Sequence, residues 1–299
     1  MSNDNLHEYY DLKCATCWTQ LYDFCDRHFN SDKQNNQWVF RGQADSSWGL
    51  KSTLERALEY FEIDLSKKAS GVELGLLRKF KRHYHHYLES PIENDNSLEW
   101  LAIMQHYGTP TRLLDWTYSF YVALYFAMNH VKENGSASVW ALDTDWIGEV
   151  MNGYLGSLEG HGDAYAAWKD DKGILEKDTF KKIFAPKQKP PIALIGVVSP
   201  LRLNKRLTIQ QGTFLCPGDV TKTFEENLIA LLTKRNPESK SHFIKLVIHS
   251  EQKNKILEHL QRMNMNDATL FPGLDGLARS LRTLMVSPDI FLNPGNEEL

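Results

Sequence analysis

The segment from His106 to Thr117 constrains this chain more than any other stretch of it. It reads His-Tyr-Gly-Thr-Pro-Thr-Arg-Leu-Leu-Asp-Trp-Thr and so concentrates titratable and polar groups in a short space. Pro110 has no backbone N–H and pushes the residue before it towards an extended conformation. Apolar residues then recur at helical spacing from Phe120 to Val131. The sequence therefore predicts a polar turn that enters a buried helix, with Asp115 and Thr117 at the positions of N-terminal caps.

Two interpretations of this segment are open from the pattern alone. In the functional one, the His, Arg, Asp and Trp side chains form a site at the start of the helix. In the structural one, the helix is simply well capped, Trp116 lies in the core, and an Arg112–Asp115 pair holds the turn. A motif match is a hypothesis until its structural context is known.

The composition is that of an ordinary globular protein. The 299 residues are 24% charged and 42% hydrophobic, which excludes a disordered or fibrous chain. The net charge of −4 creates no general attraction to nucleic acid, although a local basic cleft is compatible with it. No apolar run approaches the length of a membrane span, and the first residues lack the pattern of a signal peptide. These features predict a cytoplasmic protein with reduced thiols.

The cysteines offer one candidate metal or redox motif, Cys14-Ala-Thr-Cys17. This spacing is that of half a zinc site, but no second Cys or His pair follows at the spacing of a zinc finger. The pair also falls in a segment with a helical stripe. We therefore expect these cysteines to pack, and we expect no metal.

Periodicity predicts an irregular order of helices and strands along the chain. The predicted helices are about 7–30, two between residue 50 and about 89 with a linker at 64–70, 97–105, the one from Phe120, and one around 256–263. The predicted strands are 38–40, 137–142, 192–198, 208–215 with a bulge at Gly212, and 243–248. Without regular β-α-β alternation, the pattern favours an α+β fold.

We interpret the chain as one domain over residues 1–299. Residues 1–37 add an N-terminal helix, and residues 143–191 form an insertion of short helices and loops that can flank the site. Residues 243–299 add a strand and helices at the C-terminal end. The basic run from Lys79 to His86 fits a solvated helix face, with a phosphate or nucleic-acid contact as the alternative.

Arg41 stands at the end of the first predicted strand, followed by Gly42. A planar guanidinium there suits a phosphate or a carboxylate. The structural alternative is an ion pair with Asp45 or Asp115.

Four blocks, taken together and in this order, resemble those of FRG-domain proteins. They are Trp38–Gln43 (WVFRGQ), His106–Thr117, Arg206–Phe214 (RLTIQQGTF) and Leu270–Leu277 (LFPGLDGL). The layout of the first three is also similar to the ADP-ribosyltransferase superfamily. There, an Arg or His on the first strand, a Ser/Thr/Tyr motif leading into a helix, and a Glu on a later strand bind NAD and polarise its glycosidic bond.

This resemblance implies a split mixed β-sheet core and NAD, or a related nucleotide, as substrate. Phe40-Arg41-Gly42 resembles the first-strand motif, Asp115-Trp116-Thr117 the motif before the helix, and Gln210 and Gln211 take the position of the Glu. The implied catalytic residues are Arg41, His106, Asp115 and Gln211. The implied nucleotide-binding residues are Arg41, Gly42, Gln43, Arg112, Trp116, Thr117 and Gln210.

The glutamine is a departure from that pattern. An amide can hydrogen-bond the ribose hydroxyls but adds no charge to stabilise an oxocarbenium-like state. Asp115 or His106 are the nearest substitutes in the sequence. The hypothesis is an NAD-cleaving enzyme that passes ADP-ribose to a protein, a nucleic acid or water, as a bacterial toxin or antiviral defence effector. The alternatives are a catalytically silent nucleotide-binding or interaction module and a nucleic-acid-binding enzyme.

Overall fold

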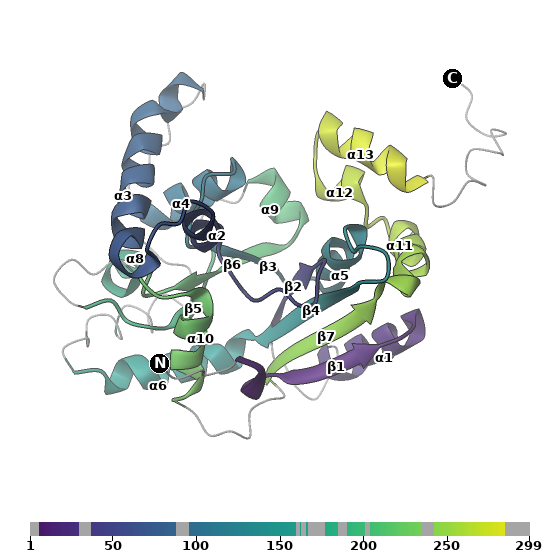
Figure 1. The fold of residues 1–299 in the computed structure, drawn as a ribbon, viewed down its shortest axis with the longest axis horizontal. Coiled ribbons are helices and arrows are strands. Elements are labelled where there is room, and N and C mark those ends of the chain that lie inside the picture. Colours follow the sequence, from purple (N-terminus) through teal and green to yellow (C-terminus); the bar gives the residue numbers. More distant parts are fainter. Residues whose placement is uncertain are drawn as a thin grey trace.

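A seven-stranded mixed sheet runs through the middle of the molecule, in the order β1-β7-β4-β2-β3-β6-β5 (Figure 1). The computed structural model describes residues 6–29, 37–87, 96–159, 162, 166, 177–184, 190–200, 204–234 and 242–284. The strands are β1 (Asp11–Ala15), β2 (Trp38–Gln43), β3 (Leu114–Thr117), β4 (Ser136–Asp143), β5 (Ile195–Val198), β6 (Gly212–Pro217) and β7 (Phe243–His249). Only the β1–β7 pair is parallel among these strands. The α+β class predicted from the sequence is confirmed.

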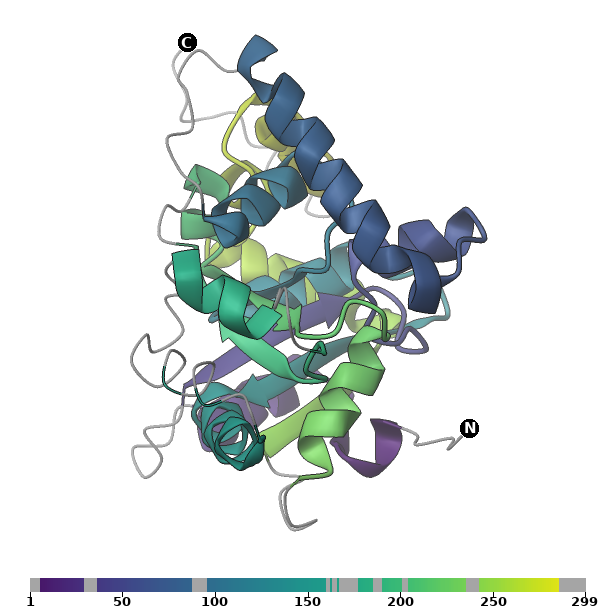
Figure 2. The ribbon, with the colours of Figure 1, turned by 90° about the vertical axis from the view of Figure 1, so that its left-hand side faces the viewer.

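Helices cover both faces of this sheet (Figures 1 and 2). They are η1 (Leu6–Glu8), α1 (Trp18–Phe29), α2 (Thr53–Tyr60), α3 (Leu65–His83), η2 (Tyr84–His86), α4 (Ser97–His106), α5 (Phe120–Asn129), α6 (Thr144–Ser157), α8 (Lys177–Phe184), α9 (Lys205–Ile209), α10 (Phe224–Leu232), η4 (Ser250–Gln252), α11 (Lys253–Arg262), α12 (Asp267–Leu270) and α13 (Leu274–Leu284).

The alternation of side chains along the strands divides the core in two. Phe40 of β2 points to the face covered by α1, α5 and α11, whereas Val39 points to the face covered by α4, α6, α8 and α10. The same part of the core as Val39 also contains the buried residues Trp146 of α6 and Phe184 of α8. These two helices of the predicted insertion are thus part of the main body and do not line the site described below.

The sheet opens between β2 and β3. β2 is paired with β4 along its whole length, from Trp38 to Gln43, but its pairing with β3 is a single one, Phe40 with Thr117. Beyond that pair the two strands separate. We call this opening the β2–β3 fork. It brings the residues after Phe40 opposite those before Thr117 without backbone pairing between them.

Gly42 lies in this fork, where α5 packs directly on the backbone of β2. A Cβ atom at this position would lie 1.9 Å from the carbonyl oxygen of Ala123 and 2.7 Å from the amide nitrogen of Ala127. Both contacts are with backbone, so the helix as a whole would have to move. The first-strand glycine that the resemblance assigned to nucleotide binding therefore has a packing reason of its own.

Gly42→Ala is expected to lower the free energy of unfolding by about 3 kcal/mol or more, because overpacking of this kind typically costs about 1–3 kcal/mol even when side chains can adjust. The measurement is urea unfolding followed by circular dichroism. Gly75→Ala is the matched control, because its Cβ would meet nothing within 4 Å on α3. That variant should be as stable as the wild type or up to about 1 kcal/mol more stable. Equal stability of the two variants would contradict the packing argument.

Two predictions for the N-terminal half were wrong. Residues 7–30 are not one helix: Asp11–Ala15 form β1 at the edge of the sheet, with Cys14 in the strand, and α1 follows. Residues 64–70 are not a linker, because α3 begins at Leu65 with Asp64 as its N-cap. The polar residues of that stretch lie on the exposed side of α3. From the sequence alone, they suggested a break between two helices.

The boundaries around the central motif also differ from the prediction. Asp115 and Thr117 lie in β3, and Ser119 caps α5 by accepting a hydrogen bond from the Val122 amide. The predicted strand 208–215 is instead the end of α9, a turn, and the start of β6. Helix α10 was not predicted. β3 and β6 pair with each other although they lie far apart in the sequence, and such a distant partner overrides the local pattern.

Candidate functional site

A cavity of about 570 Å³ lies at the β2–β3 fork, a volume typical of small-ligand sites. Its walls come from β2, β3, the C-terminal end of α4, α5, and the turn from α9 to β6. Eight of the ten residues implied by the resemblance line it. These eight are Arg41, Gly42, Gln43, His106, Asp115, Trp116, Thr117 and Gln210. Segments far apart in the sequence thus meet at one hollow.

Arg41 crosses the fork. Its Nη1 donates a hydrogen bond to the backbone carbonyl of Asp115 at 2.6 Å, so the guanidinium bridges the two separated strands. Burial lowers the pKa of Arg41 to about 10, an effect that the Asp115 carboxylate opposes and the Arg56 guanidinium adds to. Arg41 therefore remains a cation at neutral pH. Its buried Nε has no hydrogen-bond acceptor among the residues that the structure describes.

Asp115 is held in place by Gln105, the penultimate residue of α4. The Gln105 Nε2 donates to the Asp115 carboxylate at 2.8 Å. The Gln105 Oε1 accepts from the hydroxyl groups of Thr53 at 3.1 Å and Thr111 at 2.6 Å. Since both ends of the amide are engaged, its orientation is fixed. Gln105 therefore fixes one acidic group at the edge of the cavity, and this role was not predicted from the sequence.

The charged groups that line the cavity are mostly cationic. Three guanidinium groups, those of Arg41, Arg56 and Arg206, face one carboxylate, that of Asp115. Burial lowers the pKa values of both Arg41 and Arg206, and the Asp115 carboxylate opposes the lowering in each case, which places these charges near one another. Burial lowers the pKa of His106, and Arg206 lowers it further. His106 is therefore neutral at pH 7 and can accept a proton, while the cavity as a whole attracts anions.

Two lining residues, Thr117 and Gln43, use their polar side chains for hydrogen bonds within the protein. The Thr117 hydroxyl donates to the Gln210 carbonyl at 2.6 Å and accepts from the Ser119 amide at 3.0 Å. The Gln43 amide links Trp140 to Gly49 through hydrogen bonds of 2.6 and 2.9 Å. These contacts hold the walls in position. The Gln43 contact also anchors the loop that carries Trp48, whose ring is 54% exposed at the cavity.

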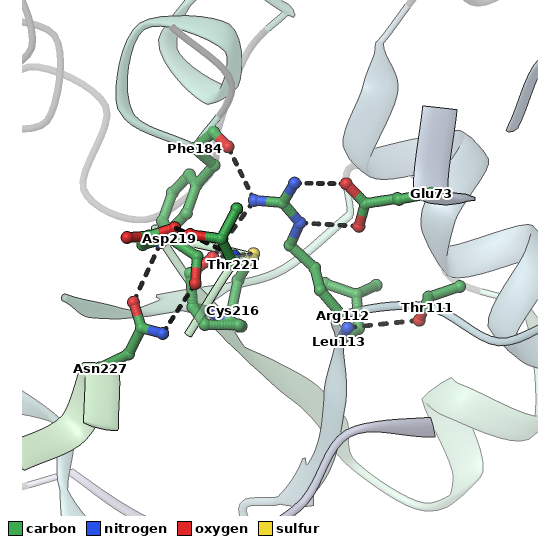
Figure 3. A network of polar contacts seen from close by, with 10 residues as sticks. Glu73, Thr111, Arg112, Leu113, Phe184, Cys216, Asp219, Thr221 and Asn227 are labelled. Atoms are coloured by element: carbon green, nitrogen blue, oxygen red, sulfur yellow. Dashed lines mark hydrogen bonds and ion pairs between the residues drawn. The ribbon is translucent and has the colours of Figure 1, made fainter. Parts of the chain in front are cut away.

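Arg112 does not line the cavity (Figure 3). Its guanidinium forms a two-pronged ion pair with Glu73 of α3, and Nη1 donates to the carbonyl of Phe184 at 2.7 Å. Both side chains of the pair are only 7% exposed. Burial alone would lower the pKa of Arg112, but Glu73 more than offsets this and raises it. Arg112 therefore pairs with Glu73 and not with Asp115. It has a structural role and lies away from the cavity in which the resemblance implies a nucleotide.

Gln211 also lies outside the cavity lining. It is exposed, has a φ angle of +48°, and forms the turn before β6. Its carbonyl accepts from the Tyr118 amide at 2.9 Å. The Gln210 side chain, which does reach the cavity, donates to the Leu270 carbonyl at 3.0 Å. Neither glutamine therefore supplies the acidic group that the resemblance places on a later strand.

Several lining residues were missed by sequence analysis. They are Trp48, Arg56, Gln105, His130 and Arg206. Gln105 and Arg206 stand beside or within the quoted blocks, so a search for every polar side chain near those blocks would have found them. Arg56 lies on the exposed side of α2, which local pattern cannot distinguish from a solvated face. The basic run at the end of α3 does not line the cavity, and Lys81 lies over the ring of Trp100 at 4.9 Å.

Within the described ranges, no three His, Cys, Asp or Glu side chains gather closely enough to hold a metal ion. Among the helices that the structure describes, none combines the length and the apolar character needed to cross a bilayer.

The fold and the cavity define an α+β protein with a cationic site in a split mixed sheet. Comparison with protein families identifies part of it: residues 36–136 match the FRG domain. This third of the chain is similar to the FRG domain, and the matched segment contains Arg41, His106, Asp115 and Thr117. The blocks at 206–214 and 270–277 lie outside the match. No curated protein and no solved structure matches the chain.

Proposed function

We propose that the cavity binds NAD or a closely related dinucleotide and promotes cleavage of its N-glycosidic bond. One observation carries this proposal. Three guanidinium groups, those of Arg41, Arg56 and Arg206, line one cavity together with a single carboxylate, that of Asp115. This excess of positive charge in an enclosed hollow favours an anionic ligand.

The cationic lining suits the phosphates of a dinucleotide. Guanidinium groups match phosphate oxygens in geometry as well as charge. The exposed ring of Trp48 at the same cavity offers a surface on which a base can stack. The ligand class that fits both features is a nucleotide with a negatively charged phosphate chain.

Asp115 would supply the charge for the chemical step. As the bond between ribose C1′ and the nicotinamide nitrogen breaks, the electron pair leaves with nicotinamide and positive charge develops on the ribose. The carboxylate held by Gln105 would stabilise that charge. A water molecule or an acceptor group then forms the new bond to C1′ and gives its proton to neutral His106. Consumption of NAD in this way is the activity of a toxin or a defence effector.

A binding module without turnover is the second candidate, and the position of Gln211 favours it. The residue that the resemblance aligns with a catalytic Glu is an amide and lies away from the cavity. In this case the same contacts would bind the nucleotide, and Asp115 would serve only to orient Arg41 and Arg206.

Incubation of the purified protein with NAD distinguishes these functions. The enzyme should release nicotinamide and show a higher melting temperature with NAD. Asp115→Asn should abolish release and keep the shift in melting temperature, whereas Asp23→Asn, on the exposed side of α1, should change neither. A shift without release identifies the binding module. Neither release nor a shift at millimolar NAD would reject the proposal.

A further inference from the structure

The block Leu270–Leu277 lies next to the cavity but outside its lining. Its Phe271 ring is in contact with two guanidinium groups: the Cζ of Arg206 lies 4.8 Å from the ring centroid and the Cζ of Arg279 lies 4.4 Å from it. The ring of Phe126, which lines the cavity, meets Phe271 edge-on at 5.9 Å. Phe271 therefore supports two residues of the cavity wall from behind.

The glycines of this block shape the turn that presents Phe271. Gly273 has a φ angle of +140°, which L side chains rarely adopt. A Cβ atom at Gly276 would lie 1.8 Å from the Phe271 carbonyl oxygen, so only glycine lets α13 start this close to the turn. Gln210 ties the turn to the cavity wall through its hydrogen bond to the Leu270 carbonyl.

The contact leaves the donors of Arg206 available. Stacking on an aromatic ring uses the face of the guanidinium, whereas the N–H groups point outward in its plane. Within the described residues, the guanidinium of Arg206 has no ion pair or hydrogen bond, and the contact with Phe271 fixes only its plane. An arginine that is held in this way loses less side-chain freedom when it binds an anion.

We propose that Phe271 is a positioning residue that holds Arg206 at the cavity as a second phosphate-binding group beside Arg41. The two guanidinium groups come from different walls of the cavity, one from β2 and one from α9, and the Asp115 carboxylate lines the cavity with both. Two separate cations match two linked phosphate groups better than they match a single phosphate group. The inference rests on the proposed nucleotide site and assigns the ligand a diphosphate group.

Calorimetric titration of the full chain with pyrophosphate, orthophosphate and ADP-ribose tests this assignment. Pyrophosphate should bind more tightly than orthophosphate. Arg206→Ala should weaken the binding of pyrophosphate and of ADP-ribose about thirtyfold, because it removes one hydrogen-bonded contact with a charged group. Phe271→Leu should weaken both about fivefold, since the ring no longer holds the guanidinium. Phe271→Tyr, which keeps the ring, should bind within about twofold of the wild type.

Two further variants separate positioning from other effects. Arg279→Ala removes a cation from the same ring without touching the cavity and should change binding by less than about twofold. The double variant Arg206→Ala with Phe271→Leu should bind no more weakly than Arg206→Ala alone, because Phe271 acts through that arginine. The inference would be overturned if the losses of affinity in the two single variants added up in the double variant. It would also be overturned if Arg279→Ala lost as much affinity as Phe271→Leu, or if the wild type bound orthophosphate as tightly as pyrophosphate. Tight pyrophosphate binding without any NAD binding would instead reject the proposed function and leave this inference standing.

Discussion

Replacement of Arg112 by alanine is expected to lower the free energy of unfolding by about 3–5 kcal/mol, because it leaves the Glu73 carboxylate buried without a partner. The pair is only 7% exposed, so water cannot solvate the remaining charge. The variant also removes the hydrogen bonds to the carbonyls of Phe184 and Pro217, which join α8 and β6 to this arginine. Figure 3 shows the contacts of Arg112 with Glu73 and Phe184, which join α3 and α8 to the segment before β3 and which the variant would lose.

Urea unfolding followed by tryptophan fluorescence measures this effect, with two comparisons. Arg262→Ala removes an exposed partner of Glu258 and should cost less than about 1 kcal/mol. The double variant Arg112→Met with Glu73→Leu removes both charges and should be more stable than Arg112→Ala, since no lone charge stays buried. If Arg112→Ala were as stable as Arg262→Ala, the ion pair would contribute little to the fold.

Replacement of Arg41 by alanine is expected to weaken the binding of NAD and ADP-ribose by about 10- to 100-fold. This is the loss of affinity that usually follows when a hydrogen bond to a charged group is removed. The variant removes the cation at the centre of the β2–β3 fork together with the buried Nε that lacks an acceptor. Arg41→Lys keeps the charge but not the planar fork, so its affinity should fall between those of the wild type and the alanine variant.

Calorimetry with ADP-ribose measures these affinities without interference from turnover. Arg262→Ala is the control, because it removes an exposed arginine away from the cavity lining. Melting temperatures of all variants without ligand establish that the fork remains folded. Unchanged affinity in a folded Arg41→Ala variant would remove Arg41 from the binding site.

The elements that the sequence predicted well are those whose local pattern is sufficient. β4 and β7 are rich in apolar and β-branched residues, and the α5 stripe from Phe120 is regular, so their positions followed from the local pattern. β1 and β3 are different. β1 has an alternating pattern that depends on its pairing with β7, and β3 is short and polar at Asp115. Both are strands because a neighbouring strand supplies hydrogen bonds, which no local pattern records.

The sequence by itself determined the chemical groups of this protein: a strand that carries Arg41, a polar motif with His106 and Asp115, and a buried helix behind them. Only the tertiary structure decided which arginines face the cavity. Arg112 lies in the middle of the motif yet is buried against Glu73, 39 residues away in the chain, whereas Arg206 comes to the cavity with Phe271 beneath it. The reason is physical: the free energy of a charged side chain depends on its burial and its partners, and both are set by segments that are distant in the sequence.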